Sequence, residues 1–319
     1  MKRINFSLLF VATAISLYSS GMYAAEEKSN AAESGTGNIK FSNDLSLEDL
    51  STGKKKVTAT LWDFHGILGI WDREAEEKCV SKKFEYLNYS KFHQLKAEYP
   101  KNPAMAQEIM LRDLEILREK TLESNPKLKA DFDRVPKGAF EQGAAVFRKH
   151  GYNDIADFID SLAVAYKPRP GMESAVKILA ALGIKQYLAS NIAPHVYELV
   201  KNKFKKEHDN SMLDIILVGA MLDVSSYGPV PDSTIAQTKL VKQPKPSREF
   251  FQTYRNHSEK DGVTVFVDDQ QRNIDEAIKH GPMIGVFLDS KDPKFITKLV
   301  ASFNILNISL DGTRTSNPS

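Results

Sequence analysis

The sequence contains one cysteine, Cys79, among its 319 residues. A single cysteine cannot form an internal disulfide, and without partner cysteines we expect no thiolate metal site. Neither sign of charge predominates, because 43 basic and 41 acidic side chains leave a formal net charge of +2. Nucleic acid and anionic membrane surfaces are therefore not expected partners. With 42% hydrophobic residues, the chain can still bury a large core.

A long membrane-spanning run is also lacking. The apolar stretch "INFSLLFVATAISLY", which follows Lys2 and Arg3, is short for a membrane span of about 20 residues. Its basic start and small-residue exit predict a secretory signal peptide over residues 1–25, with an uncleaved anchor as the alternative. We therefore expect a periplasmic or secreted protein with no stable membrane insertion after cleavage. The polar segment that follows predicts a flexible leader over 26–55.

Strands and helices alternate along much of the remaining chain. The apolar runs "VTATLW", "IKQYLAS", "LDIILVG", "VTVFVDD" and "MIGVFL" predict strands, and helical spacing separates the later ones. Such alternation is typical of βαβ units, in which helices cover both faces of a parallel sheet. We therefore predict an α/β, Rossmann-like three-layer core over residues 56–71 and 167–303.

The segments outside this core differ in character. Residues 72–166 show helical spacing, which predicts a helical insertion, and nothing there resembles a strand. Residues 221–243 are rich in turn-forming residues, so we predict a loop or short hairpin of unassigned role. Residues 304–319 are predicted to form a polar C-terminal tail.

Polar residues follow three of the predicted strands. Asp63 ends the first strand, Ser190 ends the second, and Asp268 and Asp269 end the fourth. In open parallel sheets, ligands bind at the carboxyl ends of the strands. Each residue alone has an ordinary explanation as a helix cap or turn residue. Together they indicate a single site for phosphate and metal chemistry.

The residue types suggest how such a site would work. An aspartate such as Asp63 can attack phosphorus and form an acyl-phosphate that water then hydrolyses. Asp268 and Asp269 offer the hard oxygen ligands that Mg²⁺, or another divalent ion such as Mn²⁺, prefers. Lys245 in "KQPKPSREFF" can add positive charge, and Ser190 with its neighbour Asn191 can bind phosphate oxygens. We expect a small phosphorylated substrate.

The same motifs resemble those of the haloacid dehalogenase-like (HAD) hydrolase superfamily. "LWDFHGIL" is similar to its first motif, an apolar strand followed by Asp-x-Asp-Gly, and "YLASN" to its second. "KPSREFF" resembles its third motif and "VFVDDQQRNIDEA" its fourth, and all four stand in family order. The resemblance implies that residues 72–166 form a cap that selects substrates. It also implies a metal site of Asp63, His65, Asp268 and Asp269.

His65 departs from the family pattern. The phosphatases of this family have an aspartate two positions after the nucleophile; its carbonyl oxygen contacts the metal, and its side chain acts as acid and base. Histidine, with an ordinary pKa near about 6.5, suits proton transfer near neutrality. An imidazole bound to the metal is the alternative and would favour softer ions.

The predicted function is an exported, divalent-metal-dependent phosphatase acting through an aspartyl-phosphate at Asp63. Asp63, His65 and Lys245 are the predicted catalytic residues. The departure at His65 leaves two alternatives open: a catalytically impaired HAD scaffold that serves as a binding protein, or a HAD hydrolase of another chemistry, such as carbon–halogen cleavage. The sequence does not indicate an oligomeric state.

Overall fold

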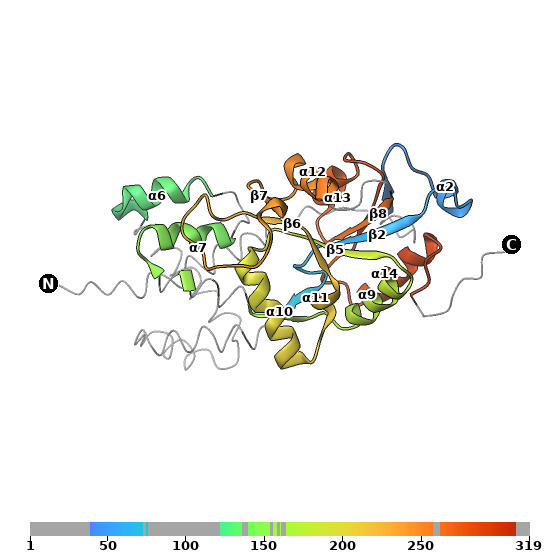
Figure 1. Cartoon of the computed structure of the whole chain (residues 1–319), viewed down its shortest axis with the longest axis horizontal. Helices are drawn as coiled ribbons and strands as arrows, with labels where there is room; N and C mark the ends of the chain where they lie inside the picture. The colour runs from blue at the N-terminus through green and yellow to red at the C-terminus, as the bar shows by residue number, and fades with distance from the viewer. Residues whose placement is uncertain are drawn as a thin grey trace. The chain divides into compact units, whose positions relative to one another are not determined.

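The chain is described by a computed structural model over residues 39–72, 75, 122–135, 140–153, 156–157, 160, 164–257 and 262–310 (Figure 1). It divides into two compact units. One holds the described residues of Asp72–Ala165 together with Val224–Pro231. The second holds the other described residues, including every predicted site residue.

A seven-stranded sheet forms the centre of the second unit. Its strands in spatial order are β1 (Ile39–Phe41), β9 (Met283–Phe287), β8 (Val263–Asp268), β2 (Val57–Trp62), β5 (Lys185–Ser190), β6 (Leu217–Leu222) and β7 (Leu240–Val241). Neighbouring strands pair in parallel, except that β1 runs antiparallel to β9. The predicted α/β fold with a mostly parallel sheet is confirmed.

Helices flank this sheet on both sides. Figure 1 shows α12 and α13 on one side and α9 and α14 on the other. The helices of this unit are α2 (Leu47–Ser51), α9 (Met172–Ala181), α10 (Pro194–His208), α11 (Met212–Ile215), the 3₁₀ turn η2 (Gln237–Lys239), α12 (Arg248–His257), α13 (Gln271–Ala277) and α14 (Phe295–Ile305). The result is the Rossmann-like three-layer arrangement expected from the sequence.

The pattern of apolar residues explains these layers. Every residue of β8 is buried, as expected for a central parallel strand covered on both faces. The α12 helix buries Phe250, Phe251 and Tyr254, which helical spacing places toward the sheet. Phe251 and Tyr254 join Phe266 of β8 in one apolar cluster. This packing holds the carboxyl ends of the central strands in place.

Two predictions about the ends of the core were wrong. The predicted leader 26–55 contains β1 and α2, because β1 finds backbone partners on the edge of β9, with Ile39 opposite Val286. The predicted tail from 304 begins inside α14, and the chain beyond that helix still buries Leu306, Ile308 and Leu310. Both segments are part of the core where they are described.

The segment 221–243 also differs from the prediction. Instead of a loop or hairpin, its start completes β6 and its end forms β7, which pairs in parallel with β6 at Met221 and Leu240. Between them, Val224–Pro231 belongs to the first unit. There Gly228 approaches α7 (Phe140–Lys149) so closely that a Cβ atom would lie 2.1 Å from the carbonyl oxygen of Ala145.

A second, two-stranded sheet was not predicted. Strand β3 (Gly69–Trp71) pairs antiparallel with β4 (Tyr166–Pro168), and Trp71 lies opposite Tyr166. The expectation that no strand occurs from residue 72 until residue 182 was therefore wrong at β4. These strands border the inserted segment. The turn that follows Asp63 ends at Gly69, where β3 begins and pairs with β4.

In the first unit, the structure describes α6 (Pro126–Phe132) and α7 (Phe140–Lys149), in agreement with the helical character predicted there. Several predictions lie outside the described residues: the signal peptide over 1–25, the leader up to residue 38, Cys79, most of the predicted cap and the tail beyond 310. Among the described helices, none combines the length and apolar character needed to cross a membrane.

Candidate active site

The carboxyl ends of three adjacent strands bring the predicted acids together. Strand β2 lies between β5 and β8, so Asp63, directly after β2, has Ser190 and Asp268 on its two sides. The amide of Asp63 donates to the carbonyl of Val267, 3.0 Å away, which continues the β2–β8 ladder. The sheet topology therefore sets the spacing between Asp63 and Asp268.

Lys245 lies between these two carboxylates. Its Nζ atom is 2.7 Å from Oδ1 of Asp63 and 2.7 Å from Oδ2 of Asp268. Its side chain is 2% exposed, so these contacts are shielded from water. The backbone amide of Lys245 donates to Oδ1 of Asn191 over 2.8 Å. The side chain of Asn191, predicted to bind substrate, thus holds the lysine-bearing loop.

Asp269 completes a group of three carboxylates. One oxygen each from Asp63, Asp268 and Asp269 can be chosen so that all lie within 4.8 Å of one another. Burial, together with repulsion from the other two acids, raises the pKa of Asp269 to about 8. Burial also raises the pKa of Asp268, to about 6, against the opposing effect of Lys245. Three acids thus face a single ammonium group.

This excess of acidic over basic side chains is what a cation site requires. Burial alone would lower the pKa of Lys245, but the two carboxylates raise it above the ordinary value, so the lysine is charged. One ammonium cannot neutralise three carboxylates, and the remaining oxygens are ligands for a hard divalent ion. Asp63, Asp268 and Asp269 therefore fit Mg²⁺ or Mn²⁺ as oxygen donors.

Ser190 is fully buried beside the nucleophile candidate. Its hydroxyl hydrogen-bonds the carboxylate of Asp63 and opposes the rise in pKa that burial causes there. The same Oγ atom accepts from the amide of Ile192 at 3.3 Å. Ser190 therefore orients Asp63 in this structure, and its predicted contact with phosphate stays a prediction.

Asn273 orients the second acid. Its Nδ2 atom lies 3.0 Å from each carboxylate oxygen of Asp268, and the amide of Gln270 donates to Oδ1 at 2.8 Å. Asn273 is 2% exposed and lies in the first turn of α13. The segment from Asp268 to Asn273 therefore supplies both an acid and the residue that holds it.

His65 lies in the turn between β2 and β3. Its imidazole packs against the rings of Phe64 and Tyr166, with centroid distances of 5.3 and 5.2 Å. Burial and, next, the charge of Lys245 lower the pKa of His65 to about 3, although Asp268 opposes the shift. The imidazole is therefore neutral near pH 7.

Among the described residues, the side chains that could together hold a metal ion are those of Asp63, Asp268 and Asp269. The imidazole of His65 does not belong to this set. Its predicted backbone contact with a metal stays a prediction. The next residue, Gly66, has φ +79°, and its amide donates to the carbonyl of Gly69 over 2.9 Å. Glycine tolerates this left-handed conformation, which the tight turn requires.

Two residues near the site were not predicted from the sequence. Ser290, after β9, hydrogen-bonds the carboxylate of Asp269 through its side chain. Arg169 donates to the backbone carbonyls of Gly66 and Ser290. Arg169 follows β4, a strand that was not predicted, and Ser290 stands three positions beyond the end of β9.

Comparison with known proteins adds no relative to this description: no protein-family model matches the sequence, and no curated protein matches it.

Proposed function

We propose that the protein is a divalent-metal-dependent hydrolase of the HAD type, which cleaves phosphate esters through an aspartyl-phosphate at Asp63. The observation that carries this proposal is the position of Lys245, whose ammonium group lies 2.7 Å from both Asp63 and Asp268. A nucleophilic carboxylate can approach a phosphate anion only where positive charge is fixed nearby.

The residues suit a two-step displacement. In the first step, a carboxylate oxygen of Asp63 attacks phosphorus, the bond from phosphorus to the ester oxygen breaks, and the leaving oxygen takes a proton from water to become the alcohol. In the second step, water attacks phosphorus, the bond from phosphorus to Asp63 breaks, and inorganic phosphate leaves. Lys245 stabilises the charge on the reacting groups, and Ser190 holds the orientation of Asp63.

Asp268 and Asp269, together with Asp63, would hold the metal. When bound, Mg²⁺ supplies positive charge to the phosphoryl oxygens and shields the acids from one another. The neutral imidazole of His65 can accept a hydrogen bond from the water of the second step and orient it, but a pKa of about 3 makes it a weak base. It is poorly suited to protonate a leaving alcohol in the first step.

The state of His65 also favours a second candidate function, a phosphate-binding protein without turnover. A site with Asp63, Lys245 and a metal but no acid for the leaving group would bind a phosphorylated ligand and release it unchanged. Calorimetric titration with Mg²⁺ and inorganic phosphate, beside a turnover assay, separates the two. Binding without hydrolysis of any ester supports the second candidate.

A substrate screen tests the main proposal. Purified protein should hydrolyse members of a phosphate-ester panel with Mg²⁺, Mn²⁺ or Co²⁺, and EDTA should abolish the activity. The Asp63→Asn variant should lose about 10⁴-fold or more in turnover, because the nucleophile is gone. Asp232→Asn, at an exposed aspartate of the same unit, is the matched control. Equal hydrolysis by Asp63→Asn and wild type would reject the proposal.

A further inference from the structure

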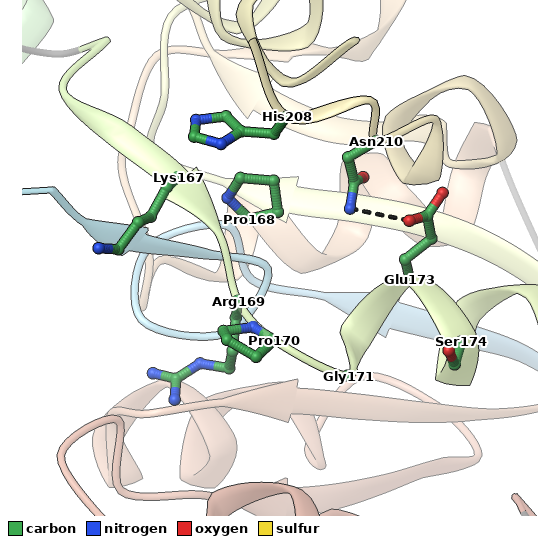
Figure 2. Close-up of a pocket in the computed structure, with 9 residues that line it drawn as sticks. All are labelled: Lys167, Pro168, Arg169, Pro170, Gly171, Glu173, Ser174, His208 and Asn210. Carbon is green, nitrogen blue, oxygen red and sulfur yellow. Dashed lines mark hydrogen bonds between the residues drawn. The ribbon is translucent and has the colours of Figure 1, made fainter.

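Arg169 is a largely buried cation that the proposed reaction does not use. It lies between β4 and α9 and is 9% exposed. A surface cavity of about 290 Å³ borders it, lined also by Lys167, His208 and Asn210. Figure 2 shows the guanidinium group turned away from His208 and Asn210. Its function therefore lies with the groups it contacts on the other side, rather than in this cavity.

Those groups belong to two loops that are distant in sequence. The Nη2 atom of Arg169 donates to the carbonyl oxygen of Gly66 at 2.5 Å and to that of Ser290 at 2.8 Å. The guanidinium carbon lies 3.8 Å from the centroid of the Phe295 ring. A planar, delocalised cation can stack on a ring while donating in its own plane, which an ammonium group cannot do.

Both loops meet Asp269. A Cβ atom at Gly66 would lie 2.2 Å from Oδ2 of Asp269, so the carboxylate rests directly against the glycine backbone. The side chain of Ser290 also hydrogen-bonds Asp269, and its Cβ atom would lie 2.8 Å from the same added Cβ at Gly66. Arg169 thus holds the two backbone segments that contact this carboxylate.

Charge connects the same residues. Asp269 and Asp289 both favour the protonated guanidinium of Arg169 and oppose the effect of burial on its pKa. Arg169 therefore adds positive charge near the acids beside the ammonium of Lys245. Its two hydrogen bonds to backbone carbonyls add geometric control of the loops that carry or contact metal ligands.

We propose that Arg169 is a positioning residue of the carboxylate site, which sets the place of Asp269 by holding the carbonyls of Gly66 and Ser290. This inference rests on the proposed function, because it assigns Asp269 to the metal. It predicts that loss of the guanidinium weakens metal binding itself and not only turnover. Changes to partners that orient metal ligands typically cost about 10-fold to 100-fold in affinity or activity.

The test is a calorimetric titration of Mg²⁺ into the full-length protein without substrate. Arg169→Met keeps most of the apolar stem and should weaken Mg²⁺ binding by about 10-fold to 100-fold. Arg169→Lys, which keeps the charge, should fall between wild type and Arg169→Met. Arg134→Met, at an arginine whose side chain is 76% exposed, is the matched control and should bind Mg²⁺ like wild type.

Coupling to Ser290 distinguishes positioning from general stabilisation. If Arg169 acts on Asp269 through Ser290, Ser290→Ala should weaken Mg²⁺ binding in wild type and have less effect in Arg169→Met. Fully additive effects in this cycle would overturn the inference. Arg169→Lys serves the same cycle if Arg169→Met does not fold.

The outcomes separate this inference from the proposed function. Wild-type protein that binds Mg²⁺, with Arg169→Met or Arg169→Lys binding it equally tightly, overturns the role of Arg169 and leaves the proposed function standing. Wild-type protein that neither binds Mg²⁺ nor hydrolyses phosphate esters overturns both.

Discussion

The Nζ atom of Lys245 lies 2.7 Å from Oδ1 of Asp63, although 182 positions separate the two residues in the sequence. The contact is buried and shared with Asp268, so one ammonium group serves as the counter-ion of two acids. In a buried group of this kind, removing one partner leaves the others uncompensated, which costs more than the loss of a surface ion pair.

Replacement of this lysine should therefore affect both activity and stability. We expect Lys245→Met to reduce turnover by about 10²-fold to 10³-fold, the range seen when a stabilising group for transition-state charge is removed. The free energy of unfolding should fall by about 3–5 kcal/mol. Lys242→Met, at an exposed lysine in the same loop, is the control. A normal rate in Lys245→Met would contradict the role given to the lysine.

Substitutions of His65 test whether its imidazole takes part in the reaction. Because its neutral imidazole follows the nucleophile by two positions and can orient the attacking water, His65→Ala should slow turnover by about 10²-fold, the lower end of the range for groups that assist proton transfer. His65→Asp should preserve or raise the rate, since it restores the residue of the family pattern. Turnover numbers on one phosphate ester with Mg²⁺ decide this. An unchanged rate in His65→Ala would remove histidine from the mechanism.

Gly66 and Gly183 form a matched pair of glycines. Both have left-handed backbones, with φ +79° and +80°, but only Gly66 faces the site, and a Cβ at Gly183 would meet nothing within 4 Å. Gly183→Ala should cost about 1 kcal/mol of unfolding free energy from the backbone alone. Gly66→Ala should cost more and should also weaken Mg²⁺ binding, because the new methyl group displaces Asp269. Denaturant unfolding and calorimetry measure the two effects, and equal costs would contradict the close approach.

The raised pKa of Asp269 predicts a pH-dependent stability. An acid whose pKa is higher in the folded than in the unfolded state binds more protons when folded, so its contribution to stability falls as the pH rises from about 4 to about 8. In EDTA, Asp269→Asn should therefore become increasingly more stable than wild type over this range. Melting temperatures between pH 5 and pH 8.5 measure it.

Mg²⁺ provides the control for that experiment. Bound metal favours the ionised acid, so it should raise the melting temperature of wild type most at the alkaline end. Asp269→Asn should show a smaller rise with Mg²⁺. A constant difference between wild type and Asp269→Asn at all pH values would contradict the raised pKa.

The sequence predicted the parts of the fold and site that depend on long apolar strands. Asp63, Ser190 and Asp268 were placed correctly at strand ends, because buried parallel strands appear as continuous apolar runs that end abruptly. Strands β1 and β7, with three and two residues, carry no such pattern, and their hydrogen bonds depend on neighbours far away in the chain.

Side-chain contacts between residues far apart in sequence could not be predicted either. The hydrogen bond from Arg169 to Gly66 joins residues 103 positions apart and ends on a backbone carbonyl. No pattern of side chains in the sequence therefore indicates it. The sequence identified His65 as the unusual position of the first motif. It did not indicate that Tyr166 of β4 packs against the imidazole.

Because the loop Val224–Pro231 belongs to the helical unit, that unit cannot be moved to another protein as one continuous segment. Gly228 seats this loop against Ala145 of α7, so the helical unit is assembled from two stretches of chain that the β5–β6 portion of the sheet separates in sequence. A graft of residues 72–165 alone onto another scaffold would lack this loop and would expose the surface of α7 that the loop covers. A functional transplant would have to carry both stretches.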